Sequence, residues 1–334
     1  MALRTTTKWL AASLHYGEPW NELLIKAVKP YTDVVLQTGV AERFYFLRSW
    51  ENGPNIKLWF KGNPFILAKM LKPNLDEHFQ HYFESRPSFI NPPVYPRDCP
   101  EDYKWYPNNS VQYSSSDPSF DHSGGMVELA IVEKQYEISS NLILNTIKEK
   151  ASHWTYNEMV SSAIKMHLGF AYAMGMDLEE AFHFFSFLSD QWFESNYKKQ
   201  PDSRSKTQHS FAKIFALQRK HTIPYHAAIW ELVKRYEHME DKFFVQWIKV
   251  NANTCFELNF ALDEQKLSAK RSIFNATQDT PRGWGYYASL VRLTNNRIGI
   301  FNKNEGYLFY TMCESLKVAL QSNRTSLVGA AING

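Results

Sequence analysis

The residue types best suited to chemistry gather on one predicted helix, Tyr286–Arg297, near the C-terminal end of the chain. It carries the phenol of Tyr286, the hydroxyl of Ser289 and the guanidinium of Arg292. Tyr286 and Ser289 are three residues apart, so their side chains share one face of a helix. Hydroxyls and phenols can donate or transfer protons, and a guanidinium can stabilise developing negative charge. We expect this face to line a cleft, with ordinary packing of Tyr286 and a salt bridge or cap from Arg292 as the alternatives.

A carboxylate and an imidazole occur on a second predicted helix, Leu178–Tyr197. Asp190 and His183 are seven residues apart in a segment that is apolar nearly all round, so we expect burial and a shared face. A buried carboxylate is costly unless it is paired, and acids with raised pKa values often serve catalysis. We predict a catalytic role for Asp190 with His183 beside it. The alternatives are a surface position for Asp190 and a structural role for His183.

The N-terminal part of the chain predicts a small antiparallel sheet with two helices on one face. Its expected elements are, in order, strand 8–16, helix 20–37, strand 43–50, strand 56–61, helix 65–83 with a bend at Pro73, and strand 110–114. The Asn52-Gly53-Pro54 turn favours a hairpin between the second and third strands. The order β-α-β-β-α-β is the ferredoxin-like pattern. Arg43 and Arg48 bracket the aromatic second strand, which indicates either peptide binding or simple solvation.

The rest of the chain predicts helices only. They are expected at 126–149, 156–174, 178–197, 211–219, 225–236, 243–260, 286–297 and 305–320, with an exposed loop at 198–207. The fold class is therefore α+β, an N-terminal ferredoxin-like sheet fused to a mainly helical C-terminal half. We place the boundary between residues 1–122 and 123–334, and expect one cooperative unit with a cleft between the two parts.

Composition excludes several classes of protein. The 334 residues carry a net charge of +3, too mild to make a nucleic acid or an anionic membrane the main partner. Three widely spaced Cys without a Cys/His cluster argue against disulfides and zinc, and favour the reducing cytoplasm. No apolar run is long enough for a membrane span. Aromatic residues make up 15% of the chain, a composition that suits amphipathic clefts as well as cores.

Three segments together resemble the C-terminal elimination domain of lantibiotic dehydratases and its stand-alone thiopeptide-type relatives, which include pyridine-forming cyclases. The first is Phe44–Arg48 with Pro54–Phe60, similar to the family's "FFIRY…PHLRLRF". The second is Gly124–Met126 with Glu128–Ala130 and Ser139-Ser140, similar to "RYGG…MELAE…SS". The third is Ser289–Leu293 with Asn296-Arg297, similar to "SLLHM…NRL". Order and spacing agree over nearly the whole chain.

The resemblance implies site residues, and the sequence departs from the family pattern at each of them. The family's Arg pair falls on Lys57 and Trp59, the position before the glycines holds His122 in place of Arg, and the family His falls on Arg292. Lysine does not reproduce the planar two-point grip of arginine, and arginine is no general base near neutral pH. Glutamate elimination, the family's reaction on glutamylated Ser and Thr, is therefore disfavoured.

The resemblance then implies an enzyme that needs no cofactor or metal and closes a peptide macrocycle. Pyridine-forming relatives join two dehydroalanines in a formal aza-[4+2] cycloaddition and lose water and the leader peptide. We expect the partner to be a leader-bearing modified precursor peptide, together with other enzymes of the same pathway. The alternatives are a glutamate-eliminating subunit of a split dehydratase and a non-catalytic leader-binding module. The expected catalytic set is Ser289, Arg292, Tyr286, Asp190 and His122, and the expected substrate-binding set is Lys57, Trp59, Arg43, Arg48, Tyr287, Asn296, Arg297 and His183.

Overall fold

A computed structural model of the chain describes residues 7–96, 99–114, 125–267 and 281–332. The chain divides into two compact units, Met1–Trp154 and Thr155–Gly334. Unit 1 contains a four-stranded sheet, and the described residues of unit 2 form helices and no strand, so the predicted α+β class is confirmed. The predicted boundary after residue 122 and the cleft between the two parts stay predictions.

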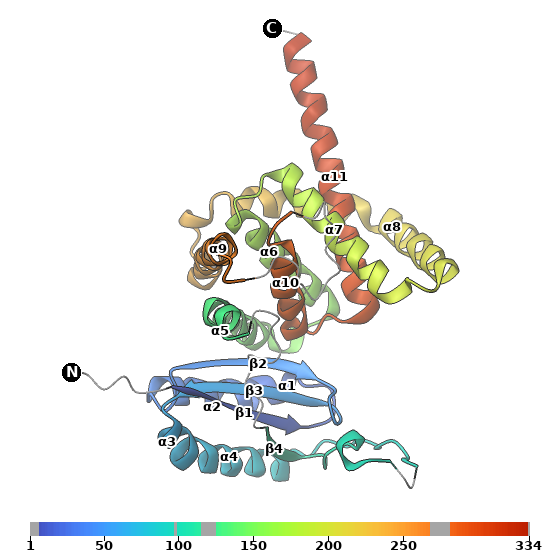
Figure 1. The fold of residues 1–334 in the computed structure, drawn as a ribbon. Helices are drawn as coiled ribbons and strands as arrows, with labels where there is room; N and C mark the ends of the chain where they lie inside the picture. The colour runs from blue at the N-terminus through green and yellow to red at the C-terminus, as the bar shows by residue number, and fades with distance from the viewer. Residues whose placement is uncertain (1–6, 97–98, 115–124, 268–280, 333–334) are drawn as a thin grey trace, which may run out of the picture. The chain divides into compact units, whose positions relative to one another are not determined.

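The sheet of unit 1 is antiparallel, with the strand order β2-β3-β1-β4 that the ferredoxin-like pattern requires (Figure 1). Its strands are β1 (Lys8–His15), β2 (Arg43–Ser49), β3 (Asn55–Gly62) and β4 (Ser110–Ser114). The register places Ala12 opposite Leu58 and Tyr113, and Leu58 opposite Phe46. Because side chains alternate between the two faces of a strand, these residues share one face. That face is apolar and fully buried at Leu58 and Phe46, so it forms the core of the unit.

Two broken helices cover the apolar face, and each contains one π-helical turn before a proline. The first comprises α1 (Asn21–Leu23), η1 (Leu24–Val28) and α2 (Lys29–Gln37); the second comprises α3 (Pro64–Ile66), η2 (Leu67–Leu71) and α4 (Lys72–Ser85). Pro30 and Pro73 lack the N–H that a regular helix uses, and each ring would clash with the carbonyl four residues earlier. The wider π turn accommodates this defect. The bend expected at Pro73 thus takes the form of the η2 segment.

Helix α5 (Gly125–Lys150) belongs to unit 1 and lies on the other side of the sheet from α4 (Figure 1). The Phe46 amide of edge strand β2 donates to the Ser140 hydroxyl at 3.2 Å. The rings of Tyr45 and Tyr136 lie 5.3 Å apart between centroids. Helix α5 therefore covers part of the polar and aromatic face of the sheet beside β2. The short helices η3 (Glu101–Tyr103) and η5 (Ala151–His153) complete the unit.

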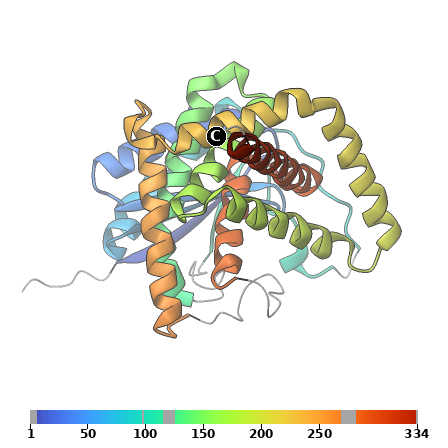
Figure 2. The same cartoon turned by 90° about the horizontal axis from the view of Figure 1, so that it is seen from above.

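Unit 2 is built from long helices whose starts are encoded locally. They are α6 (Tyr156–Ala173), α7 (Leu178–Tyr197), α8 (Pro201–Val233), η6 (Tyr236–His238), α9 (Lys242–Asp263), α10 (Trp284–Ile298) and α11 (Asn302–Ile332). Thr155 and Asp241 cap α6 and α9, and Asp177 forms a capping box with Glu180 at the start of α7. Helix α7 runs alongside α11, and α6 packs on α9 (Figure 2).

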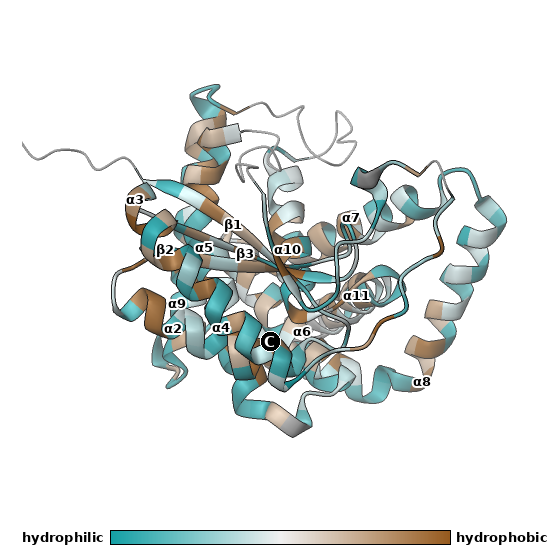
Figure 3. Cartoon of the chain, turned by 90° about the horizontal axis from the view of Figure 1, so that it is seen from below, coloured by the Kyte–Doolittle hydropathy of each residue, from teal (hydrophilic) through white to brown (hydrophobic). Residues whose placement is uncertain are grey.

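The predicted loop at 198–207 and the gap before residue 225 are wrong. Only residues 198–200 lie outside helices, because Pro201 occupies the first turn of α8, where its missing N–H costs nothing. Pro224 lies inside the same helix, which continues to Val233. Buried Phe211 and Trp230 on either side of Pro224 anchor the helix, so packing offsets the lost hydrogen bond. Brown and teal segments alternate along α8, as expected for a helix with one packed face (Figure 3).

Within the described ranges, no helix combines the length and hydrophobicity needed to cross a lipid bilayer. In the same part of the chain, no three side chains of His, Cys, Asp or Glu are grouped in a way that would hold a metal ion.

Candidate functional site

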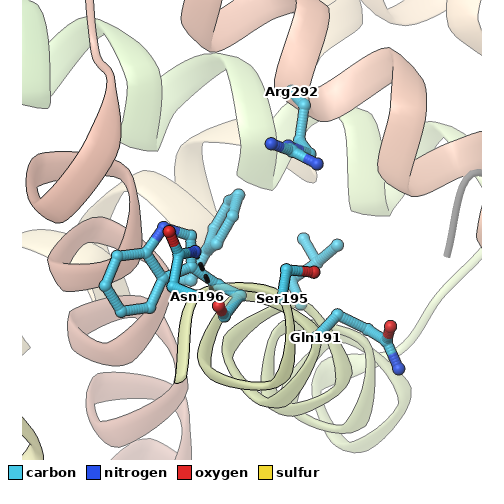
Figure 4. A pocket seen from close by; sticks show the side chains of 7 residues that line it. Gln191, Ser195, Asn196 and Arg292 are labelled. Atoms are coloured by element: carbon cyan, nitrogen blue, oxygen red, sulfur yellow. Dashed lines mark hydrogen bonds between the residues drawn. The ribbon is translucent and has the colours of Figure 1, made fainter. Parts of the chain in front are cut away.

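The strongest candidate site in unit 2 is a small pocket that contains the side chain of Arg292 (Figure 4). Its other walls come mainly from α7. The empty space it encloses together with the solvent at its mouth is about 250 Å³, but the cavity proper is only about 10 Å³, so it is a shallow depression. The lining residues are Leu188, Gln191, Trp192, Ser195, Asn196, Arg292 and Phe309. Four of the α7 positions, 188, 191, 192 and 195, follow helical spacing, so one face of α7 forms this wall. The pocket therefore presents one cation among neutral polar and apolar groups.

A buried carboxylate holds the cation of this pocket. Arg292 Nε lies 3.5 Å from Glu305 Oε2, and the Glu305 side chain is only 8% exposed whereas that of Arg292 is 43% exposed. Burial raises the pKa of Glu305, and the Arg292 guanidinium opposes that shift. An ion pair with one buried partner keeps a more fixed geometry than a pair of exposed side chains. Glu305 of α11 therefore orients the Arg292 side chain.

The other predicted residues of α10 divide between its two faces. Ser289 and Asn296 are half-buried and fall at helical spacing on either side of Arg292, so they share its face. The Ser289 hydroxyl donates to the Gly285 carbonyl at 3.1 Å. Tyr286 and Arg297 are buried, at 4% and 0% exposure, and Arg297 donates to the Leu293 carbonyl at 3.2 Å. Ser289, Arg292 and Asn296 therefore share one face of α10, although of these three only Arg292 lines the pocket, and Tyr286 and Arg297 lie inside the unit.

Tyr287 is directed toward α9. Its hydroxyl donates to Asn259 Oδ1 at 2.7 Å, its ring contacts Phe170 at 6.2 Å between centroids, and burial raises the pKa of its phenol. A phenol that is buried and hydrogen-bonded in this way packs two helices together. Tyr287 does not line the Arg292 pocket.

The predicted pair on α7 is not buried. Asp190 and His183 are both exposed, because the buried face of α7 passes through Phe184, Leu188 and Trp192. Partial desolvation by neighbouring side chains raises the pKa of the Asp190 carboxyl, and the positive charge of Arg204 on α8 opposes this shift. Neither residue lines the Arg292 pocket. The expected burial of this segment all round was wrong, since only one face of α7 is covered.

The predicted cations on the sheet of unit 1 are paired with neighbouring acids. Arg43 contacts Glu133 and Glu137 of α5, Nε to Oε1 at 3.3 Å and Nη1 to Oε2 at 3.1 Å. Lys57 forms an ion pair with Glu51 and lies 5.9 Å from the centroid of the Trp59 ring. These contacts give Arg43 and Lys57 structural partners within their own unit.

Trp59 and Arg48 are buried, at 3% and 6% exposure. The Trp59 ring stacks on Tyr45 at 4.9 Å, and the Arg48 guanidinium lies 5.9 Å from the centroid of the Trp20 ring. Burial lowers the pKa of Arg48 to about 10. These two residues contribute packing to the sheet, while His122 lies outside the described residues.

Sequence reasoning missed most of the pocket wall and the carboxylate beneath it. Gln191, Ser195 and Asn196 are uncharged, so their types alone gave no signal of a site. Asn196 Nδ2 donates to the Trp192 carbonyl at 2.8 Å, which directs its amide along the wall. Glu305 stood at the start of a predicted helix, where an acid is common for local reasons. The 188–191–192–195 spacing places these residues on one face of α7. It would have indicated the pocket wall only if the packing of that face beside α10 had been known.

Comparison with known proteins gives a family and a fold. The sequence pattern of the family described as "Lantibiotic biosynthesis dehydratase C-term" matches residues 9–316. A comparison with curated protein sequences gives no match.

Three solved structures share the fold at low sequence identity. The structure described as "Pyridine synthase, TbtD, from thiomuracin biosynthesis" has a TM-score of 0.71 at 14% identity, over 92% of this chain and 97% of that one. The structure of TsrL has a TM-score of 0.59 at 13% identity, over 95% and 96%. The tRNA-dependent lantibiotic dehydratase MibB from Microbispora sp. 107891 has a TM-score of 0.60 at 14% identity, over 95% of this chain and 28% of that chain. At these identities the likeness is one of fold.

Proposed function

Because the chain belongs to the lantibiotic biosynthesis dehydratase C-terminal family, as the sequence resemblance predicted, we propose that it modifies a ribosomally made precursor peptide. The proposed reaction is a formal aza-[4+2] cycloaddition of two dehydroalanines, followed by loss of water and of the leader peptide to give a pyridine macrocycle. The similarity to the TbtD pyridine synthase over 92% of this chain and 97% of that one supports this reaction over others in the family.

The observation that carries the proposal is the composition of the Arg292 pocket. It offers one oriented guanidinium, and none of the described residues that line it is an acid or a histidine. A cycloaddition depends mainly on holding two ends of one chain in a near-attack geometry, and much of its barrier can be removed by positioning. A fixed cation can also stabilise negative charge that develops on an amide oxygen as water departs. A pocket with neutral walls suits a substrate whose reacting groups are uncharged.

The proposal gives Arg292 and Ser289 the central roles. Arg292 holds the oxygen that becomes negative, and Ser289, on the same face of α10, donates a hydrogen bond to the bound peptide after leaving the Gly285 carbonyl. Asn296 extends the same face and contacts the peptide backbone. Proton transfer from Tyr286, Asp190 or His122 remains part of the proposal. On unit 1, Lys57 and Arg43, the partly exposed members of the expected substrate-binding set, would contact the leader. The proposed partners are the leader-bearing peptide and other enzymes of its pathway, and the proposed compartment is the cytoplasm.

One observation favours a second candidate, elimination of glutamate from a glutamylated peptide. Arg292 already faces the carboxylate of Glu305, so the same guanidinium is suited to the carboxylate of a glutamate leaving group. The fold likeness to MibB agrees with this candidate. Elimination also needs a base near the α-carbon, and the described lining residues supply none.

The test is incubation of the purified protein with a precursor peptide that contains two dehydroalanines. We expect a macrocycle and free leader, detected by mass spectrometry, and no product from a peptide with one dehydroalanine replaced by alanine. A parallel reaction with a glutamylated peptide measures free glutamate. Unchanged mass in both, with peptide binding demonstrated by fluorescence anisotropy, would contradict an enzymatic role and favour a binding module.

A further inference from the structure

A chain of hydrogen bonds links the interior of unit 2 to the guanidinium in the pocket. His167 Nε2 lies 2.6 Å from Asn295 Oδ1, and Asn295 Nδ2 lies 3.2 Å from Glu305 Oε1. The other carboxylate oxygen, Glu305 Oε2, faces Arg292 Nε at 3.5 Å. The four residues come from α6, α10 and α11. His167 and Asn295 are 0% exposed and Glu305 is 6% exposed, so the chain begins in the core and ends at the pocket.

The chemistry of the acceptors fixes the direction of each bond. An ionised carboxylate only accepts, so the amide nitrogen of Asn295 must face Glu305 and its amide oxygen must face His167. His167 therefore donates from Nε2, and its buried Nδ1 has no hydrogen-bond partner among the described residues. Burial lowers the pKa of His167 to about 4, which keeps this neutral form near pH 7. Two donors, from Asn295 and Arg292, thus converge on the carboxylate of Glu305.

We propose that His167, Asn295 and Glu305 are positioning residues that fix the orientation of the Arg292 guanidinium toward the bound peptide. This inference rests on the proposed function of the pocket. Glu305 orients the guanidinium through Nε, Asn295 holds the carboxylate against rotation, and His167 holds the amide. A flexible arginine side chain loses much rotamer freedom when it binds a substrate, and pre-orientation removes most of that loss before binding. Each member acts on the substrate only through Arg292.

The chain offers matched controls for a purely structural role. Asn251 of α9 is also 0% exposed, and its amide donates to the Trp247 carbonyl of its own helix at 2.7 Å. His226 of α8 is 1% exposed and contacts the Thr222 carbonyl at 2.7 Å through Nδ1. Glu314 lies on α11, as Glu305 does, and pairs with Lys317. These residues match the three positioning residues in type and lie on helices, and their contacts named above do not include Arg292, Asn295 or Glu305. The Glu314 side chain is more exposed than that of Glu305, at 31% against 8%.

The direct test is the NMR signal of the Arg292 Nε–H, recorded on the full chain with 15N-labelled arginine and assigned with Arg292→Lys. Glu305→Gln offers one acceptor oxygen to two donors, so we expect exchange of the Nε–H with solvent to rise about tenfold. Asn295→Ala should raise it about threefold, and His167→Gln by less. Glu314→Gln, Asn251→Ala and His226→Gln should leave it unchanged. An unchanged signal in Glu305→Gln overturns the proposal without reference to catalysis.

Activity on the two-dehydroalanine peptide gives the second arm of the test. Glu305→Gln and Asn295→Ala should lower kcat about tenfold and threefold, with the controls within twofold of the unmodified chain. Loss of the ordered Nε–H with unchanged kcat would contradict a positioning role. The NMR signal can respond as expected in Glu305→Gln and Asn295→Ala while Arg292→Lys retains full activity. In that case the hydrogen-bonded chain exists but the proposed function of the pocket fails.

Discussion

Cations occur on both units, but their surroundings differ. On unit 1, Arg43 and Lys61 share Glu133, with Lys61 Nζ 2.6 Å from Oε2, and Lys57 pairs with Glu51. On unit 2, Arg292 contacts a carboxylate that two further buried residues hold in place.

The comparison separates two uses of a basic side chain. The cations of unit 1 tie α5 and the hairpin turn to the sheet, so their removal should change stability. Arg292 lines a pocket and is oriented by the core, so its removal should change activity. Residue type alone does not distinguish a stabilising cation from a functional one, since Arg43, Lys57 and Arg292 each form an ion pair with a carboxylate.

The largest expected effect concerns acid stability, and it differs between the units. Burial lowers the pKa of His167 and of His226 in unit 2 to about 4, and that of His15 in unit 1 to about 4 with help from Lys57. The unfolded chain binds these protons near pH 6.5, so the free energy of unfolding falls as the pH drops from 6.5 toward 4. Each histidine accounts for about 3 kcal/mol.

Unit 2 should therefore lose more stability than unit 1 in this pH range, although burial also lowers the pKa of His78 in unit 1. Urea unfolding with a tryptophan probe confined to each unit would measure it, and His226→Gln should remove about half of the loss in unit 2. The raised pKa of Glu305 acts in the opposite direction at pH values above the ordinary pKa of a glutamate side chain, and so offsets part of the loss in unit 2. Equal losses in both units would contradict the prediction.

The next effect is on catalysis. Arg292→Lys keeps a positive charge but lacks the planar fork of the guanidinium, so we expect at least a 100-fold fall in the rate of macrocycle formation. Arg43→Lys on unit 1 should change the rate less than threefold. Initial rates by mass spectrometry would test this pair, and the reverse ranking would move the site to the sheet.

A smaller effect is expected on the stability of unit 1. Glu133 has an 11% exposed side chain and two cationic partners, and Glu133→Gln should lower the free energy of unfolding by about 1–3 kcal/mol. The rate per folded molecule should not change. Thermal unfolding followed by circular dichroism, together with the peptide assay, would check both statements.

The smallest effects come from two glycines at close helix crossings in unit 2. A Cβ at Gly306 would lie 2.4 Å from the Trp192 ring, and a Cβ at Gly169 would lie 2.8 Å from the Phe244 ring. Both alanine variants should lose about 1–2 kcal/mol through overpacking. Because Trp192 lines the pocket, only Gly306→Ala should also slow the reaction, by a few-fold at 25 °C. Equal rates in the two variants would show that the pocket tolerates a displaced Trp192.

Much of the fold was predictable from local sequence. Alternating side chains in β1 to β3 and the Asn52-Gly53 turn determine the hairpin and its buried face, and Asp177 with Glu180 marks the start of α7. The continuity of α8 through Pro224 was not predictable, because it depends on packing of the helix against its neighbours. The two π turns have a local cause, Pro30 and Pro73, but the sequence predicted only a bend at Pro73 and not the form of the turn.

The site was only partly predictable. Arg292, Ser289 and Asn296 share a face that helical spacing defines, and the structure keeps them together. His167 and Asn295 are 128 residues apart, so no local pattern pairs them. The only local sign was a histidine, His167, between the apolar residues Met166 and Leu168. That pattern indicates a buried polar group but does not identify Asn295 as its hydrogen-bond partner.

The central claim is that the reacting part of the peptide binds in the Arg292 pocket rather than on the sheet. The most direct measurement is photo-crosslinking with a two-dehydroalanine peptide that carries a photoreactive group beside one dehydroalanine, followed by mapping of the linked residues by mass spectrometry. The account predicts crosslinks within 188–196 and 289–296, and their loss when unlabelled peptide competes. Competed crosslinks confined to 43–61 would contradict it.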